Sequence, residues 1–109
     1  MNDQIDLRGA SGAVYRYRLD NPAWPENAAG GAFVYVRQAQ HGPQVVYASH
    51  TDCLARADLE RWQEAIADYG ATHLYTRLHV SRAARSEELE DLIAALKPAM
   101  NEALAARAA

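Results

Sequence analysis

The sequence has a single cysteine, a single lysine and no apolar run long enough to cross a membrane. One cysteine, Cys53, cannot form a disulfide within the chain, which excludes a disulfide-stapled scaffold. No secretory signal is recognisable at the start, so we expect a cytoplasmic protein without a membrane partner. The cations are almost all arginine, which predicts that any anion would be bound by planar guanidinium groups rather than by ammonium groups.

The length and composition are those of one folded domain. The 109 residues are 50% hydrophobic, which is enough for a modest core and excludes global disorder. The net charge of −3 argues against a broad electrostatic surface for nucleic acid, although it is compatible with a local arginine patch. Residues 1–12 are polar and contain two glycines, so we predict a mobile lead-in there and a single domain over residues 13–109.

Alternation of apolar and polar residues predicts four strands. The first covers residues 13–19, and the last covers residues 71–80, where the alternation is clearest. Between them, residues 32–38 and 44–49 each hold one tyrosine and are joined around a His-Gly-Pro sequence. Glycine and proline favour a short connection, so these two segments are predicted to form a β-hairpin.

Helical spacing appears after the hairpin and again after the last strand. A short helical turn is expected near residues 52–56, followed by a longer amphipathic helix that Gly70 is positioned to end. The next helix can be capped by Ser81 or Ser86, and Pro98 separates it from an alanine-rich helix. The predicted fold class is therefore α+β, with a small, mostly antiparallel sheet, made of the hairpin and added strands, flanked by helices.

This order of elements resembles the GIY-YIG nuclease superfamily over about residues 31–101. The triplets that match the family's Gly-Ile-Tyr and Tyr-Ile-Gly are residues 33–35 and 47–49, which keep both tyrosines and lack both glycines. The late Leu-x-Pro-x-x-Asn sequence is the best local match, with Pro98 and Asn101 in the family's places. The resemblance implies a GIY-YIG-like fold.

The resemblance also implies metal-assisted phosphodiester hydrolysis. In the family a hairpin tyrosine helps to activate water, an arginine on the first helix stabilises phosphate charge, and a glutamate on a later helix holds a divalent ion. Carried over without gaps, the arginine position falls on Ala57 and the glutamate position on Leu89, which also continues an apolar stripe and is expected to face the core. Arg56, Glu88 and Glu90 lie one residue away, a rotation of about 100° on a helix.

Three hypotheses about function follow. The first is a GIY-YIG-like domain with a degenerate site that needs no cofactor and acts as a binding or regulatory module, for nucleic acid, for a protein partner or in a homodimer. The second is an active, divergent endonuclease that requires Mg²⁺ or Mn²⁺, with Glu88 as the metal ligand. Its catalytic residues would be Tyr35, Tyr47, Arg56 and Glu88. The third is a protein-interaction domain without a nucleic-acid role.

Arginines interleaved with tyrosines on the strands would stack bases and hold phosphates if one face of the sheet exposed them. The residues predicted for such contacts are Arg37, Tyr75, Arg77 and His50. The alternative is a solvated sheet face with cross-strand pairs, and the hairpin tyrosines equally fit cross-strand packing. The histidines show no metal spacing, since His73 and His79 would lie about 20 Å apart along one strand.

Overall fold

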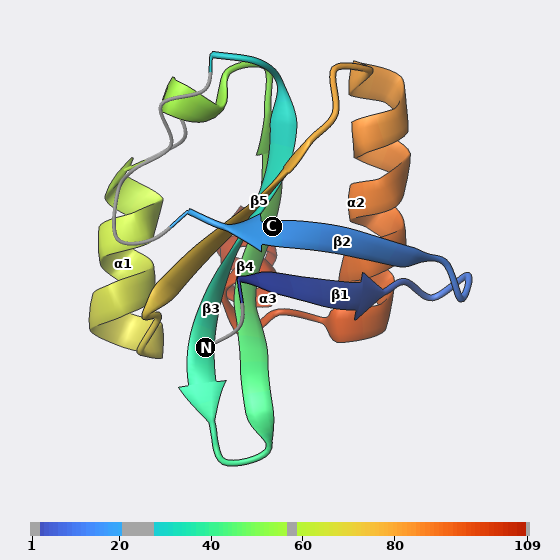
Figure 1. Ribbon diagram of the computed structural model, residues 1–109. Coiled ribbons are helices and arrows are strands. Elements are labelled where there is room, and N and C mark those ends of the chain that lie inside the picture. The colour runs from blue at the N-terminus through green and yellow to red at the C-terminus, as the bar shows by residue number, and fades with distance from the viewer. Residues whose placement is uncertain (1–2, 21–27, 57–58, 109) are drawn as a thin grey trace.

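The computed structural model describes residues 3–20, 28–56 and 59–108. It has an α+β fold with one antiparallel sheet and three α-helices (Figure 1), which confirms the predicted fold class. The elements in chain order are β1 (Gln4–Arg8), β2 (Val14–Leu19), β3 (Gly31–Ala39), β4 (Gly42–Thr51), the 3₁₀ helix η1 (Leu54–Arg56), α1 (Leu59–Tyr69), β5 (His73–Leu78), α2 (Arg82–Leu96) and α3 (Ala99–Ala108). Within the described residues, no helix combines the length and the apolar composition needed to cross a membrane.

The five strands are arranged in the order β1-β2-β5-β3-β4, so the last strand of the chain lies at the centre of the sheet. β3 and β4 form the predicted hairpin, with Tyr35 opposite Tyr47. β5 pairs with β3 over six residues but with β2 over only two. The sheet is curled, and Figure 1 shows β1 and β2 crossing in front of the hairpin strands at a steep angle.

Two hydrophobic clusters lie on opposite faces of the sheet. On one face, α1 and α3 cover a cluster that contains Tyr35 and Leu74. On the other face, α2 covers a cluster that contains Val34, Tyr75 and Leu92. Leu74 and Tyr75 are successive residues of a strand and therefore point to opposite faces. Figure 1 shows α1 and α2 on the two sides of the central strands, which explains why consecutive residues of β5 are buried.

The helix ends follow the signals in the sequence. Gly70 adopts φ 71° immediately after α1, a conformation that glycine tolerates and other residues rarely adopt. Of the two serines predicted as caps, Ser81 is the N-cap of α2, and its hydroxyl accepts a hydrogen bond from the Ala84 amide at 3.3 Å. Lys97 takes the left-handed conformation at the end of α2, and Pro98 then separates α2 from α3.

Residues 4–8 form a strand, which corrects the prediction of a mobile lead-in over residues 1–12 for this part of the chain. Gln4–Arg8 pair with β2, and Ile5 and Leu7 pack against the cluster that α2 covers. An alternation of only five residues is too short to be distinguished from a polar loop by periodicity. The boundary predicted at residue 13 therefore lies inside the sheet.

The hairpin is tighter than the sequence suggests. Gly42 and Pro43, which were predicted to lie in the connection, are the first residues of β4 and pair with Ala39 and Gln38. Gly42 adopts φ 118°, which lets the chain reverse over a very short turn. The aromatic pair of the hairpin is thus held in a long ladder, whose register shifts next to the pair, between Tyr35 and Val36.

Asn101 in α3 closes part of the outer edge of β4. Its amide accepts a hydrogen bond from the Ala48 N–H and donates one to the Ala48 carbonyl, both at 2.8 Å. We expect Asn101→Ala to lower the free energy of unfolding by about 1–2 kcal/mol, because two part-buried backbone groups lose their partner. Urea unfolding measures this, with the exposed neighbour Glu102→Ala as the control. Equal stability of Asn101→Ala and wild type would contradict the assignment.

Candidate functional site

The two hairpin tyrosines belong to an aromatic cluster on the α1 face of the sheet. The ring centroid of Tyr35 lies 5.2 Å from that of Tyr47, 5.0 Å from that of Trp62 and 5.5 Å from that of Phe33. Tyr35 is fully buried and Tyr47 is half-buried. Such distances are those of packed aromatic rings. Cross-strand packing therefore accounts for the positions of both tyrosines.

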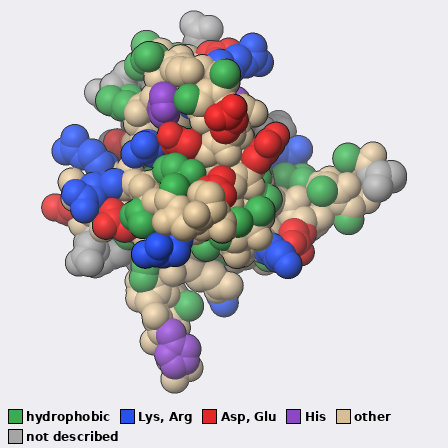
Figure 2. All heavy atoms as spheres, turned by 90° about the vertical axis from the view of Figure 1, so that its right-hand side faces the viewer, with side chains coloured by type: hydrophobic (Ala, Val, Ile, Leu, Met, Phe, Trp, Pro, Cys, Tyr) green, Lys and Arg blue, Asp and Glu red, His purple; other side chains and the backbone are tan. Residues whose placement is uncertain are grey.

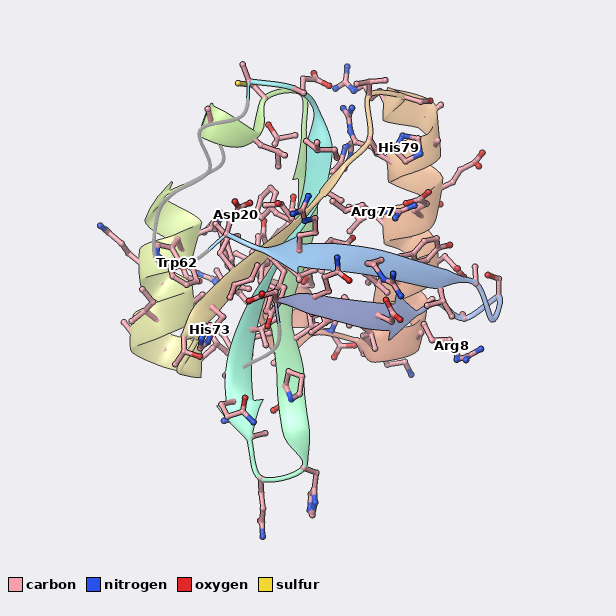
Figure 3. The ribbon with its side chains drawn as sticks, viewed as in Figure 1. Arg8, Asp20, Trp62, His73, Arg77 and His79 are labelled. Atoms are coloured by element: carbon pink, nitrogen blue, oxygen red, sulfur yellow. The ribbon has the colours of Figure 1, made fainter. Side chains whose placement is uncertain are left out.

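Glu88 lies on the other face of the sheet, on α2. Its carboxylate accepts a hydrogen bond from Arg77 Nε at 3.0 Å, and its second oxygen lies 3.4 Å from His79 Nε2. Figure 3 shows Arg77 and His79 on the α2 side of the molecule and Trp62, the neighbour of Tyr35, on the α1 side. The sheet therefore separates Glu88 from the tyrosines, and the predicted catalytic residues do not meet around one point.

The positions that the family uses for arginine and glutamate give no site either. Leu89 packs against the cluster under α2, as its place in the apolar stripe predicts. Arg56 is the last residue of η1, and its side chain and all of Ala57 lie outside the described part of the chain. Among the described residues, no group of three or more His, Cys, Asp or Glu side chains is placed to hold a metal ion. Glu88 is paired with the guanidinium of Arg77 instead.

The four residues predicted to contact nucleic acid do not share one surface. Arg37 is exposed near the end of the hairpin, where its Nε donates to Gln44 Oε1 at 2.6 Å. Tyr75 is fully buried, so its ring has no free face on which a base could stack. Arg77 and His50 are half-buried on the α2 side, where each has a protein partner.

Arg85 is the one charged residue buried in the described part of the chain, with 2% of its surface exposed. Its Nη1 donates to the carbonyls of His79 at 2.9 Å and Val80 at 3.1 Å. Its Nη2 donates to Asp52 Oδ1 at 2.5 Å, and its Nε donates to His50 Nδ1 at 3.3 Å. This guanidinium clamp joins the first turn of α2 to the ends of β4 and β5.

The role of Arg85 was not predicted, although the sequence holds a signal for it. Arg85 lies four and seven residues before Leu89 and Leu92, so it occupies the apolar stripe of α2. A charge in such a stripe predicts a buried, paired group. Gly30 makes room for it, because a Cβ atom at Gly30 would collide with the guanidinium. The four hydrogen bonds of the clamp use nearly all of the guanidinium donors, which suits a structural role.

His50 is held in its neutral form by this clamp. Because Nδ1 accepts the hydrogen bond from Arg85, the ring proton belongs on Nε2. Burial, followed by the positive charges of Arg85 and Arg82, lowers the pKa of His50. A lowered pKa means that the folded protein resists protonation more than the unfolded chain does. The stability contributed by neutral His50 is therefore present above about pH 6.5 and lost as the pH falls below it.

We expect this linkage to be visible in the His50→Asn variant, whose amide oxygen can still accept the hydrogen bond from Arg85. Between about pH 7 and pH 5, wild type should lose more free energy of unfolding than His50→Asn, because the unfolded wild-type chain binds the additional proton. Urea unfolding at a series of pH values measures the difference. If the free energy of unfolding changed equally with pH in the two proteins, the assignment of a lowered pKa to His50 would be contradicted.

A second polar clamp holds the β1–β2 turn against α2. The carboxylate of Asp91 accepts hydrogen bonds from the Ser11 amide at 2.8 Å, the Ser11 hydroxyl at 2.7 Å and the Tyr15 hydroxyl at 2.7 Å. The bonds from Ser11, followed by the bond from Tyr15, lower the pKa of Asp91. Gly9 allows this approach, because a Cβ atom there would overlap the Asp91 carboxylate.

The ionisable groups between α2 and the sheet are thus paired with one another and fix the helix in place. Glu88 holds Arg77, Asp91 holds Tyr15, and Arg85 holds the strand ends. Comparisons of the chain with protein-family models, with curated protein sequences and with solved structures give no significant match.

Proposed function

We propose that this chain is a binding module with a GIY-YIG-like scaffold whose nuclease site has degenerated, and that it does not hydrolyse nucleic acid. One observation carries the proposal: Tyr35 is packed among aromatic rings on one face of the sheet, and Glu88 is paired with Arg77 on the other. Metal-assisted hydrolysis needs the metal-binding carboxylate and the water-activating group around one phosphate. The sheet keeps these two side chains apart.

The proposed scaffold is supported by the order of elements after residue 30. A hairpin with paired tyrosines is followed by η1 and α1, by a strand next to the first hairpin strand, and by two helices with Pro98 between them. Asn101, the residue that matches the family's late asparagine, holds the edge of the hairpin. These features support the fold alone. At the positions where the family has its catalytic arginine and glutamate, this chain has Ala57 and Leu89.

A protein ligand fits the described surface better than nucleic acid does. Nucleic-acid binding needs free guanidinium groups and exposed aromatic faces on one side of the molecule. Here Tyr75 is buried, the charge of Arg77 is balanced by Glu88, and Arg37 lies at the far end of the hairpin. The net charge of −3 adds a general repulsion toward phosphates.

Metal binding tests the loss of the nuclease site. We expect calorimetric titration with Mn²⁺ to show no saturable binding to wild type, because no set of free carboxylates converges in the described part of the chain. The matched variants are Glu88→Gln and Glu87→Gln, the second being an exposed neighbour. Saturable binding that Glu88→Gln abolishes and Glu87→Gln keeps would overturn the proposal.

Salt dependence tests the class of ligand. Anisotropy of labelled single-stranded and duplex DNA and RNA is measured at about 50 and about 200 mM salt, since phosphate contacts release counterions and weaken steeply with salt. We expect no saturable binding at either concentration. Tight binding whose affinity falls by a factor of ten or more between the lower and the higher salt concentration would show that the ligand is nucleic acid instead of protein.

A further inference from the structure

One face of the sheet at β2 and β5 exposes apolar and basic side chains together. Arg18 lies opposite Thr76, so every second residue counted from this pair lies on one face of the two strands. Its exposed members in β2, in β5 and just after β5 are Val14, Arg16, Arg18, Leu78 and Val80. The three apolar side chains, in chain order, are 49%, 60% and 81% exposed. We call these five residues the open face.

The helices pack elsewhere on these strands. Tyr17 and Tyr75 alternate with the residues of the open face and belong to the buried cluster under α2, on the opposite face of the sheet. In the described part of the chain, the cluster under α1 and α3 includes Leu74 of β5 but not Leu78. The open face is therefore left to solvent, and its mixture of apolar and charged groups is that of a contact surface.

The charge on this side of the sheet is positive. β1 adds Asp6 and Arg8 to the same face, where they lie opposite Arg16 and Val14. Three exposed arginines, including Arg18, thus stand with one aspartate, whose carboxylate lies 2.9 Å from Arg16 Nε. The whole chain has a net charge of −3, so the rest of its surface is acidic. An acidic partner is favoured on the open face.

α2 carries a surface of the opposite charge. Ala83, Glu87, Glu90 and Ala94 recur at spacings of four, three and four residues and are all exposed, whereas Leu92 on the inner side is buried. We call these four residues the acidic stripe. Figure 2 shows acidic side chains on the face over α2 and a separate group of basic side chains at its left-hand edge. The molecule therefore has a basic side and an acidic side.

The acidic stripe matches the open face in spacing and in chemistry. The Cβ atoms of Glu87 and Glu90 are about 5–6 Å apart on the helix surface. Arg16 and Arg18 are about 7 Å apart along their strand, a difference that long side chains can span. An alanine at each end of the stripe lets a helix approach the exposed valines and leucine closely. Both surfaces present their charged and apolar groups on one side.

We propose that the open face binds the acidic stripe of a second copy of the chain. The two surfaces cannot meet within one copy, because α2 packs against the opposite face of the sheet. Since the two surfaces differ, the contact is heterologous, and each copy can bind one neighbour through each surface. This inference rests on the proposed binding function and names the partner.

Salt-dependent self-association tests the contact. Sedimentation equilibrium measures the average mass of the wild-type chain from about 10 μM to about 1 mM, at about 20 and about 300 mM salt. At the lower salt concentration we expect the average mass to rise with protein concentration and to exceed that of a dimer, because a heterologous contact repeats. At the higher salt concentration the association constant should fall about tenfold or more, since exposed charges are screened.

Charge reversal identifies the two surfaces. The double variants Arg16→Glu/Arg18→Glu and Glu87→Arg/Glu90→Arg should each stay monomeric at the lower salt concentration, because like charges then face each other. An equimolar mixture of the two variants should associate again. In that mixture the acidic face of the first variant meets the basic stripe of the second, and the unchanged surfaces meet as in wild type.

Two controls separate this contact from a general effect of charge or of misfolding. The variant Asp68→Arg/Glu102→Arg changes the net charge as much as the reversal on α2 does, at exposed residues of α1 and α3, and should associate as wild type does. In ¹H–¹⁵N spectra of wild type alone, dilution should shift the amide signals of residues 14–18 and 83–94. The signal of His41, in the hairpin turn, should stay in place.

The proposal is overturned if wild type stays monomeric at the lower salt concentration, or if either reversed variant still associates. It is also overturned if the mixture fails to associate, if the control loses association, or if dilution leaves residues 14–18 and 83–94 unchanged. A monomeric chain that binds anionic vesicles or an acidic helical peptide through Arg16 and Arg18 would assign the open face to another occupant. These outcomes leave the proposed function standing, because that proposal fails by metal binding or nuclease turnover.

Discussion

Arg85→Ala should lower the free energy of unfolding by about 3 kcal/mol, a large part of the stability of a small domain. The substitution removes a buried guanidinium. It leaves the carbonyls of His79 and Val80 and the ring nitrogen of His50 without their hydrogen-bond donor. It also leaves a cavity between α2 and the strand ends. Urea unfolding followed by circular dichroism measures the loss.

The matched control is Arg82→Ala, which removes an exposed arginine from the same turn of α2. It should change stability by no more than about 0.5 kcal/mol, as surface substitutions usually do. Arg85→Lys should behave more like Arg85→Ala than like wild type, because an ammonium group cannot reproduce the forked geometry. Equal effects of Arg85→Ala and Arg82→Ala would contradict the clamp.

Gly31→Ala should destabilise the protein by about 2–3 kcal/mol. A Cβ atom on Gly31 would lie 2.6 Å from the Arg77 carbonyl oxygen in the paired strand and 2.8 Å from Leu54 Cδ1. The carbonyl oxygen belongs to the ladder between β3 and β5 and cannot move without breaking pairing. Thermal unfolding monitored by circular dichroism should show a clear decrease in Tm.

Gly12→Ala provides the comparison for that prediction. Gly12 has φ 92°, but a Cβ atom there would meet nothing within 4 Å. Its substitution should therefore cost only the backbone strain, on the order of 1 kcal/mol. A Gly31→Ala variant as stable as Gly12→Ala would show that β3 and β5 approach less closely than the structure places them.

Local signals in the sequence were sufficient for most of the secondary structure. The alternation around Tyr35 and Tyr47 predicts the hairpin, and Gly70, Ser81 and Pro98 mark helix ends where the structure has them. These signals act over a few residues, so they need no knowledge of the tertiary fold. β1 was not predicted because it has only five residues, most of them polar. Its strand conformation is stabilised by pairing with β2, which its own sequence pattern does not show.

The candidate site could not be assembled from the sequence in the same way. A strand pattern shows that Leu74 and Tyr75 point in opposite directions, but it does not show which helix covers which face. The side of the sheet on which each helix packs places Tyr35 under α1, whereas Glu88 belongs to α2 on the opposite side. The apolar stripe of α2 did predict that Leu89 faces the core, because helical periodicity is again a local property.

The exposure of Leu78 and Val80 also depends on tertiary structure. Both continue the alternation that begins at the buried Leu74, yet they are 60% and 81% exposed. β2 pairs with β5 only up to the Arg18–Thr76 pair, before these two residues. The sequence pattern contains no indication of where two strands separate.

The proposal that this chain does not cut nucleic acid is tested by incubating the purified chain with labelled single-stranded, duplex and branched DNA and RNA. Mg²⁺ or Mn²⁺ is supplied, and wild type is compared with Glu88→Gln and Tyr35→Phe. We predict no cleavage above the protein-free background for any of the three proteins, because the sheet separates the two side chains. Cleavage by wild type that both variants lose would contradict the proposal that the nuclease site has degenerated.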